Sequence, residues 1–173
     1  MAKKGKYVYE WPRPMVTTDA LVFSFLRGRA RVLLVKRKYD PYKGHWAVPG
    51  GFIEIDEELA DAAARELAEE TGLTDVPLEQ MHTFGTVGRD PRGRQITVVF
   101  TGIAETGANK VQGGDDAAEA RWFDIDDLPP NIGFDHADVL AMGIRKLKRK
   151  AAYRRAMAGN HRQRTASRRR RPS

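Results

Sequence analysis

The chain has 173 residues, of which 41% are hydrophobic, so it can form one domain with a real core but is too short for two full domains. It contains no cysteine, which excludes disulfide bonds and thiolate metal sites. Any metal ion must then be held by oxygen or imidazole ligands, and this favours Mg²⁺ or Mn²⁺ over zinc.

The net charge of +7 is unevenly distributed along the chain. Residues 144–173 hold 13 of the 30 Lys and Arg residues and no Asp or Glu, whereas residues 1–143 hold 17 basic and 23 acidic residues. This division predicts an acidic domain at 1–143, followed at 144–173 by the basic end of a helix and a disordered tail.

The beginning of the chain, MAKKGKYVYEWPRP, is charged and lacks the apolar segment of a signal peptide. No later window approaches the roughly 18 apolar residues of a membrane span. We therefore expect a cytoplasmic protein that does not enter a membrane.

Segments rich in β-branched and apolar residues come first along the chain. Met15 to Leu26 and Ala30 to Lys36, separated by the turn sequence Arg27-Gly28-Arg29, are predicted to form a hairpin. A short apolar run, Trp46-Ala47-Val48, then ends in Pro49-Gly50-Gly51. At these glycines the backbone must turn or approach another group closely.

A central helix is predicted from Glu57 to Thr71, a segment rich in Ala, Leu and Glu. Its apolar positions repeat every four residues, which gives one apolar stripe along the helix. These positions are Leu59, Ala63 and Leu67. Gly72 suits the position that follows a helix end.

The second half of the chain alternates strands with turns. Met81 to Val87 and Gln95 to Ala104 are predicted strands joined by an arginine-rich turn segment, and Ala120 to Ile125 is a further short strand. A last helix is predicted from an N-cap at Asp135 to beyond Leu147. This order indicates an α/β fold in which helices cover a mixed sheet.

Three carboxylates share the polar face of the predicted central helix. Glu66 and Glu70 are four residues apart and Glu69 follows Glu66 by three, so all three can converge on one side. Each like-charge pair costs roughly 0.2–0.5 kcal/mol of helix stability, and a divalent cation would reverse that sign. For Glu69 and Glu70 taken alone, a solvated surface is the commoner interpretation.

Two neighbouring features fit a metal site. Arg65 lies four residues before Glu69, close enough to hold a carboxylate by a charge-assisted hydrogen bond, so we expect it to orient a metal ligand. Gly50-Gly51 leaves the main chain uncovered, so that a carbonyl oxygen there can act as a further ligand.

The segment GGFIEIDEELADAAARELAEETGL resembles the Nudix box of the Nudix hydrolase superfamily at every defining position. The defining positions and their spacing are Gly51, Glu57, Arg65-Glu66-Leu67, Glu69-Glu70 and Gly72-Leu73. The resemblance implies a Nudix-type α/β/α sandwich around a mixed β-sheet, which agrees with the elements predicted above. It also implies a Mg²⁺-dependent pyrophosphohydrolase, with Mn²⁺ as a substitute.

The resemblance assigns a role to each matching position. The implied metal ligands are the Gly51 carbonyl, Glu66, Glu69 and Glu70. Arg65 resembles the family's orienting arginine, and Glu57 resembles the glutamate that supports the loop and sometimes the metals.

The implied chemistry is attack of water on a diphosphate whose charge the metal neutralises. Family members carry the general base either in the box or in a later loop. Glu70 is the first candidate and Glu119 the second, with an ordinary surface role for Glu119 as the alternative. We expect Glu70, Glu69, Arg65 and Glu119 to serve catalysis.

Four flanking stretches resemble the ADP-ribose pyrophosphatase branch, including the Nudix domains of bifunctional NAD-biosynthesis enzymes. These stretches are PRPMVTTDALVF, KRKYDPYKGHWAVPGGFIE, FGTVGRDPRGRQITVVF and GFDHADVL, and they extend from Pro12 to Leu140. They imply that the nucleotide substrate is ADP-ribose, cleaved to AMP and ribose 5-phosphate.

Arginine and aromatic side chains are the candidates for substrate binding. Arg89, Arg92 and Arg94 share one loop, and guanidinium groups suit phosphate oxygens, although solvated loop charges are the alternative. Trp46 and Phe52, and also Phe84, are candidates to stack on adenine, although aromatic residues in strands more often pack in a core.

Three further candidates have weaker support. We expect His136 to cap or pack near the last helix rather than to bind metal. Lys36, Arg37 and Lys38 either line a phosphate entrance or end a strand in solvent.

Three alternatives to ADP-ribose hydrolysis stay open. Other Nudix substrates are oxidised dNTPs, NADH, dinucleoside polyphosphates and RNA 5′ ends. An ADP-ribose-sensing regulator would bind DNA through an appended winged helix, but we expect too few residues after Leu140 for one, and all box carboxylates are present. The basic tail can contact RNA nonspecifically, with a solvated tail as the alternative. A homodimer is also left open.

Overall fold

The computed structural model describes residues 9–105, 111–114 and 116–150. The elements in this part of the chain are β1 (Met15–Leu26), β2 (Arg29–Arg37), β3 (Trp46–Ala47), β4 (Gly50–Phe52), α1 (Leu59–Thr71), β5 (Glu79–Phe84), β6 (Gln95–Ile103), β7 (Ala117–Asp124) and α2 (His136–Arg149). The predicted hairpin and both predicted helices are confirmed, and α1 begins two residues later than expected. The predicted tail lies largely outside the described residues, and 144–149 continue α2.

The predicted end of α1 is confirmed, whereas the predicted cap of α2 differs in its contacts. Gly72 follows α1 with φ 69° and donates its N–H to Ala68 O, as a helix-ending glycine does. Asp135 precedes α2 as predicted, but its side chain makes no capping hydrogen bond. The carboxylate is instead bound by Arg89, so an ion pair has replaced the cap.

The strands form one mixed sheet with the order β3-β2-β1-β6-β5, in which β4 pairs with β1 and β7 pairs with β2. β1 and β6 run parallel, with Met15 opposite Gln95 and Phe23 opposite Ile103. The other strand pairs are antiparallel. Residues far apart in the chain therefore lie next to each other in the middle of the sheet.

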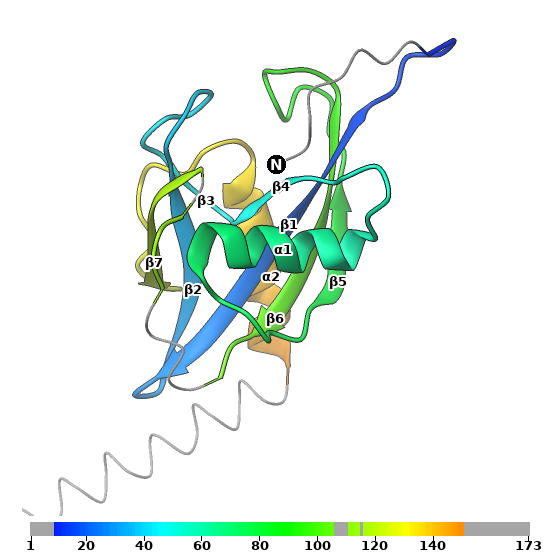
Figure 1. Ribbon diagram of the computed structural model, residues 1–173. Helices are drawn as coiled ribbons and strands as arrows, with labels where there is room; N and C mark the ends of the chain where they lie inside the picture. Colours follow the sequence, from blue (N-terminus) through cyan, green and yellow to red (C-terminus); the bar gives the residue numbers. More distant parts are fainter. Residues whose placement is uncertain (1–8, 106–110, 115, 151–173) are drawn as a thin grey trace, which may run out of the picture.

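Alternation along β1 divides the core into two layers. Leu21 and Phe23 pack with Leu140 of α2, whereas Ala20 and Val22 pack with Leu67 of α1. Figure 1 shows α1 on one face of the sheet and α2 on the other. This arrangement is the expected α/β/α sandwich.

The layer under α2 becomes polar near the first residues of β1 and β6. Thr17 and Asp19 continue the alternate positions of Leu21 on β1, and Gln95 and Thr97 do the same on β6. All four side chains are buried. These four side chains replace the apolar core here and are called the polar floor. The first residue of α2, the buried His136, lies close to it.

No helix in the described part of the chain is long and apolar enough to cross a membrane.

Candidate active site

Two glycines of β4 lie directly against two glutamates of α1, as Figure 1 shows for the two elements. The Gly50 N–H donates to Glu70 Oε2 at 3.0 Å. A Cβ atom added to Gly51 would lie 2.4 Å from Glu66 Oε1, so a side chain at this position would displace the carboxylate. The close approach of strand and helix therefore depends on glycine at position 51.

Arg65 binds several acceptors around this contact. Its Nε and Nη2 donate to the two oxygens of Glu57 at 2.7 and 2.9 Å, and Nη2 also reaches Phe52 O at 3.2 Å. Its Nη1 donates to Glu66 Oε1 at 2.8 Å and to Glu69 Oε2 at 3.2 Å. The hydrogen bonds to Glu57 and then Glu66 raise the pKa of Arg65 above its ordinary value. The guanidinium thus ties the β4–α1 loop to the helix.

The three box glutamates do not converge as the spacing allowed. Glu66 and Glu69 both turn toward Arg65, while Glu70 turns toward Gly50. Within the described residues, no group of three or more His, Asp or Glu side chains is arranged to hold a metal ion. Glu66 and Glu70 are the two that face β4.

The two glutamates that face β4 lie where burial disfavours their charged forms. Glu70 is 8% exposed, and its burial raises its pKa to about 8, with the nearby Glu66 adding to the effect. Burial likewise raises the pKa of Glu66. A cation placed between these carboxylates would favour their charged forms.

A narrow cleft lies beside the Gly50-Gly51 turn. Three arginines line it, namely Arg37, Arg89 and Arg92, and two aromatic rings lie at Arg92. The Arg92 guanidinium lies 5.3 Å from the Phe52 ring centre and 5.5 Å from that of Phe134. Arg37 lies 4.8 Å from the Phe134 ring centre, so the guanidinium groups of both arginines lie close to this ring. Burial, followed by the charge of Arg92, lowers the pKa of Arg37. An anion in the cleft would relieve the repulsion between the two arginines.

The polar floor of the cleft contains an amide with an unused acceptor. Gln95 is 4% exposed, and its Nε2 donates to Thr17 Oγ1 at 3.0 Å. Its Oε1 has no hydrogen-bond partner among the described residues. Since a buried acceptor without a partner is costly, this oxygen is suited to a donor on a bound ligand.

The three arginines predicted to bind phosphate lie in different surroundings. Arg92 lines the cleft and its side chain is 37% exposed, although it also pairs with the buried Asp90. The Arg89 side chain is 3% exposed and forms two hydrogen bonds with Asp135. Arg94 is exposed and donates to Gly85 O. The shared loop therefore brings one of the three guanidinium groups to an accessible part of the cleft.

Of the three aromatic candidates, Phe52 lies nearest the cleft. Trp46 is 8% exposed and packs edge-on against Phe123 with ring centres 4.7 Å apart, in the layer under α2. Phe84 is half-buried at the end of β5 and packs against His82.

The catalytic candidate Glu119 lies on β7, opposite Lys36, and pairs with Arg121.

Sequence patterns did not single out several residues that meet at this site. Asp116 precedes β7, and its negative charge acts to raise the pKa of both Arg37 and Glu70. Asp19 and Phe134 line the cleft together with Gln95. A carboxylate in the middle of an apolar strand, as Asp19 is in β1, was the one local signal available.

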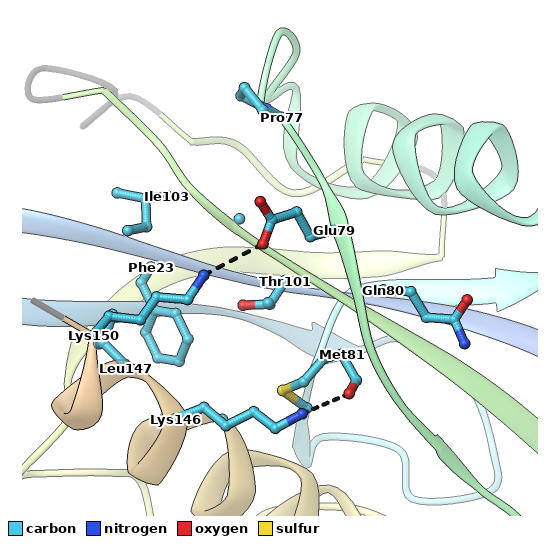
Figure 2. A pocket seen from close by; sticks show the side chains of 12 residues that line it. Phe23, Pro77, Glu79, Gln80, Met81, Thr101, Ile103, Lys146, Leu147 and Lys150 are labelled. Carbon is cyan, nitrogen blue, oxygen red and sulfur yellow. Dashed lines mark hydrogen bonds and ion pairs between the residues drawn. The ribbon is translucent and has the colours of Figure 1, made fainter. Parts of the chain in front are cut away.

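A larger hollow of about 410 Å³ lies elsewhere, between β5, β6 and the second half of α2. Figure 2 shows Lys146 donating to Met81 O and Lys150 paired with Glu79 around the apolar side chains of Phe23 and Leu147. None of the box glutamates lines it. This hollow has the larger volume, but the carboxylates and arginines that the expected chemistry needs lie at the β4–α1 site. We therefore take the β4–α1 site as the candidate active site.

A family model, described as the NUDIX domain, matches residues 15–142. The chain belongs to the Nudix family. One relative, the ADP-ribose pyrophosphatase of Methanocaldococcus jannaschii, is 41% identical over 127 residues, which cover 73% of this chain and 71% of the relative. Another, the ADPR responsive transcriptional repressor NtrR of Acinetobacter baylyi, is 33% identical over 147 residues. That alignment covers 83% of this chain and 58% of the repressor's length.

Solved Nudix structures share the fold. The NUDIX domain of Shewanella oneidensis NrtR, complexed with ADP ribose, superposes with a TM-score of 0.72 at 31% identity and covers 79% of this chain and 90% of that one. A MutT/nudix family protein from Enterococcus faecalis gives a TM-score of 0.74 at 28% identity, covering 84% of this chain and 66% of that one. The Nudix-type sandwich is thereby confirmed.

Proposed function

We propose that this Nudix protein hydrolyses ADP-ribose to AMP and ribose 5-phosphate, with Mg²⁺ or Mn²⁺ as its metal ion. The observation that carries the proposal is the position of the buried Glu70, with the half-buried Glu66 beside it against β4, in a cleft that also holds Arg37 and Arg92. The likeness to an ADP-ribose pyrophosphatase and to a domain complexed with ADP ribose supports the choice of substrate.

The residues present fit a hard divalent cation. Glu66, Glu70 and the Gly51 carbonyl offer oxygen donors close together, since Gly50 binds Glu70 and a Cβ atom on Gly51 would lie 2.4 Å from Glu66 Oε1. Mg²⁺ is commonly bound through one or two carboxylates, with waters and substrate phosphates completing its shell. We assign Glu69 to the same metal site. Its carboxylate would bind the metal after giving up its hydrogen bond with Arg65. A bound metal would neutralise diphosphate charge and favour ionisation of the attacking water.

The chain's own residues then divide the remaining tasks. Arg37 and Arg92 bind the diphosphate through guanidinium groups, and the Gln95 oxygen accepts a hydrogen bond from a ribose hydroxyl. Glu70 accepts the proton of the attacking water, because its carboxyl group lies in the cleft, held by the Gly50 N–H, and a bound cation would keep it ionised and able to accept. Asp116 and Glu119, at the start of β7, are the second candidates for this base.

The test is release of AMP from ADP-ribose by the purified full chain with Mg²⁺. Glu70→Gln should lower kcat by about 10²–10⁴-fold. Glu79→Gln, an exposed carboxylate at the hollow of Figure 2, should leave it unchanged. If NADH, dinucleoside polyphosphates or oxidised dNTPs turn over far faster, the substrate is wrong and the metal-dependent chemistry is retained.

A second candidate function, ADP-ribose sensing, is favoured by the likeness to the repressor NtrR and to NrtR, which has been solved with a 27mer DNA. A sensor would bind ADP-ribose in calorimetry without releasing AMP over hours. Rapid AMP release would reject the sensor in favour of the enzyme.

A further inference from the structure

The residues before α2 hold the segment that leads into β4. Trp46 N–H donates to Asn131 O at 2.8 Å, and Gly133 N–H donates to Trp46 O at 2.8 Å. Two residues further along, the partner changes from backbone to side chain, because the Val48 N–H donates to His136 Nδ1 at 2.9 Å. His136 thus continues a backbone ladder with its imidazole ring.

This imidazole lies close in sequence and space to the glycines of the site. Beyond Val48, the Pro49 carbonyl accepts from Ala20 N–H at 2.8 Å, and the next residue, Gly50, donates to Glu70. Gly51 follows against Glu66. Since proline has a fixed φ, a shift at Val48 would pass directly to Gly50.

The contact defines the state of the ring. Nδ1 accepts a hydrogen bond, so the proton of the neutral imidazole is on Nε2, which lies 3.9 Å from Asp19 Oδ2. Asp19 in turn accepts from Thr97 Oγ1 at 2.7 Å. The ring is 6% exposed, and burial lowers its pKa, which keeps it neutral and able to accept. β1, β6 and α2 each contribute one side chain to this group.

We propose that His136 is a positioning residue of the site, which acts by accepting the Val48 N–H and so holds Gly50 and Gly51 against Glu70 and Glu66. The catalytic part of this inference rests on the proposed function. The decisive property is an acceptor at the δ position of the side chain, and neither the charge of the ring nor metal binding by it contributes.

Three variants of the full chain separate this role from simple packing. His136→Asn keeps an acceptor at the δ position, His136→Leu has a similar size without one, and His136→Gln moves the acceptor one bond further out. Backbone amide exchange at Val48 and Gly50 should accelerate by about tenfold or more in the Leu variant and return close to wild type in the Asn variant. Exchange in the core of β1 should stay unchanged in both.

Activity should follow the same order. His136→Leu should lower kcat for ADP-ribose by about 10- to 100-fold, because a small misplacement of reacting groups is costly, while KM changes less than about threefold. His136→Asn should recover most of kcat. If the Leu variant does not fold, the Gln variant takes its place in the comparison with Asn.

Two results would overturn the inference: Val48 protection unchanged in the Leu variant, or an Asn variant as impaired as the Leu variant. The exchange experiment requires no substrate. A wild-type protein that releases no AMP would therefore remove the proposed function, while amide exchange would still decide whether His136 positions the β4 glycines.

Discussion

The Arg89 guanidinium donates two hydrogen bonds to the Asp135 carboxylate, one of 2.9 Å from Nε and one of 2.6 Å from Nη2. The pair joins the β5–β6 loop to the residue that precedes α2. The Arg89 side chain is 3% exposed. Its ion pair fixes the loop from which Arg92 reaches the cleft. Arg89, which the sequence analysis named as a candidate phosphate ligand, thus forms an ion pair inside the protein.

Removing one partner of this pair should cost more stability than removing a surface ion pair. Asp135→Asn removes the carboxylate charge that the buried Arg89 guanidinium binds, so the free energy of unfolding in urea should fall by about 3 kcal/mol. The matched control is Glu119→Gln, which breaks the exposed pair with Arg121 and should cost less than about 1 kcal/mol. Equal losses for the two variants would contradict this assignment.

Gly51→Ala should damage the site while the fold survives. The new Cβ would lie 2.4 to 2.6 Å from the Glu66 carboxylate group, which is the end of a flexible side chain and can move away. We expect AMP release to fall by about tenfold or more and the Mg²⁺-induced shift in Tm to shrink. Gly85→Ala is the control, since its nearest contact would be an ordinary 3.7 Å. A Gly51→Ala protein with wild-type activity would show that Glu66 need not lie there.

Arg65→Lys should raise the Mg²⁺ concentration needed for half-maximal activity by about 10- to 100-fold. A lysine ammonium cannot reproduce the two parallel hydrogen bonds to Glu57 while also reaching Glu66 and Phe52 O. Arg29→Lys, at an exposed pair with Asp124, supplies the control in the same titration. An unchanged Mg²⁺ requirement would mean that Arg65 does not orient the metal-binding carboxylates.

Arg92→Ala should raise KM for ADP-ribose by about tenfold or more, because a guanidinium bound to phosphate contributes a charge-assisted hydrogen bond of about 1.5–3 kcal/mol. Arg94→Ala removes an equal charge from the same loop but outside the lining of the cleft, so its KM should change by less than about twofold. Equal effects in both variants would indicate a diffuse electrostatic contribution instead of a binding contact.

Stability should depend on pH through His136. Burial lowers the pKa of its imidazole below the ordinary 6.5, with Arg89 and Arg37 adding to the effect and Asp19 and Asp135 opposing it. The unfolded chain therefore takes up a proton at higher pH than the folded protein. Stability from this group is complete above about pH 6.5 and is lost as pH falls toward the lowered folded pKa, by up to about 1.36 kcal/mol per pH unit.

Urea unfolding of wild type and His136→Asn at pH 8, 7, 6 and 5 measures this contribution. The variant should lose less stability than wild type between pH 7 and 5, since asparagine does not titrate there. Parallel curves for the two proteins would show that His136 is protonated equally in both states.

Strands and helices were predictable because their signals are local. The four-residue repeat of Leu59, Ala63 and Leu67 identified α1, and Gly72 marked its end. The same regularity placed Glu66, Glu69 and Glu70 on one side of the helix. The hydrogen bond from Arg65 to Glu69 was predictable from their four-residue spacing and is confirmed, whereas the turn of Glu66 toward the same guanidinium was not predicted.

The sequence by itself determined the family, the α/β order of elements and the helix that carries the glutamates, because these depend on residues a few positions apart. The tertiary structure alone decided which loop arginine is accessible in the cleft, and that Val48 meets His136, 88 positions away in the chain. Such contacts arise when β1 and β6 pair in parallel and α2 packs across them. No local periodicity encodes them, since they depend on how separate elements pack together.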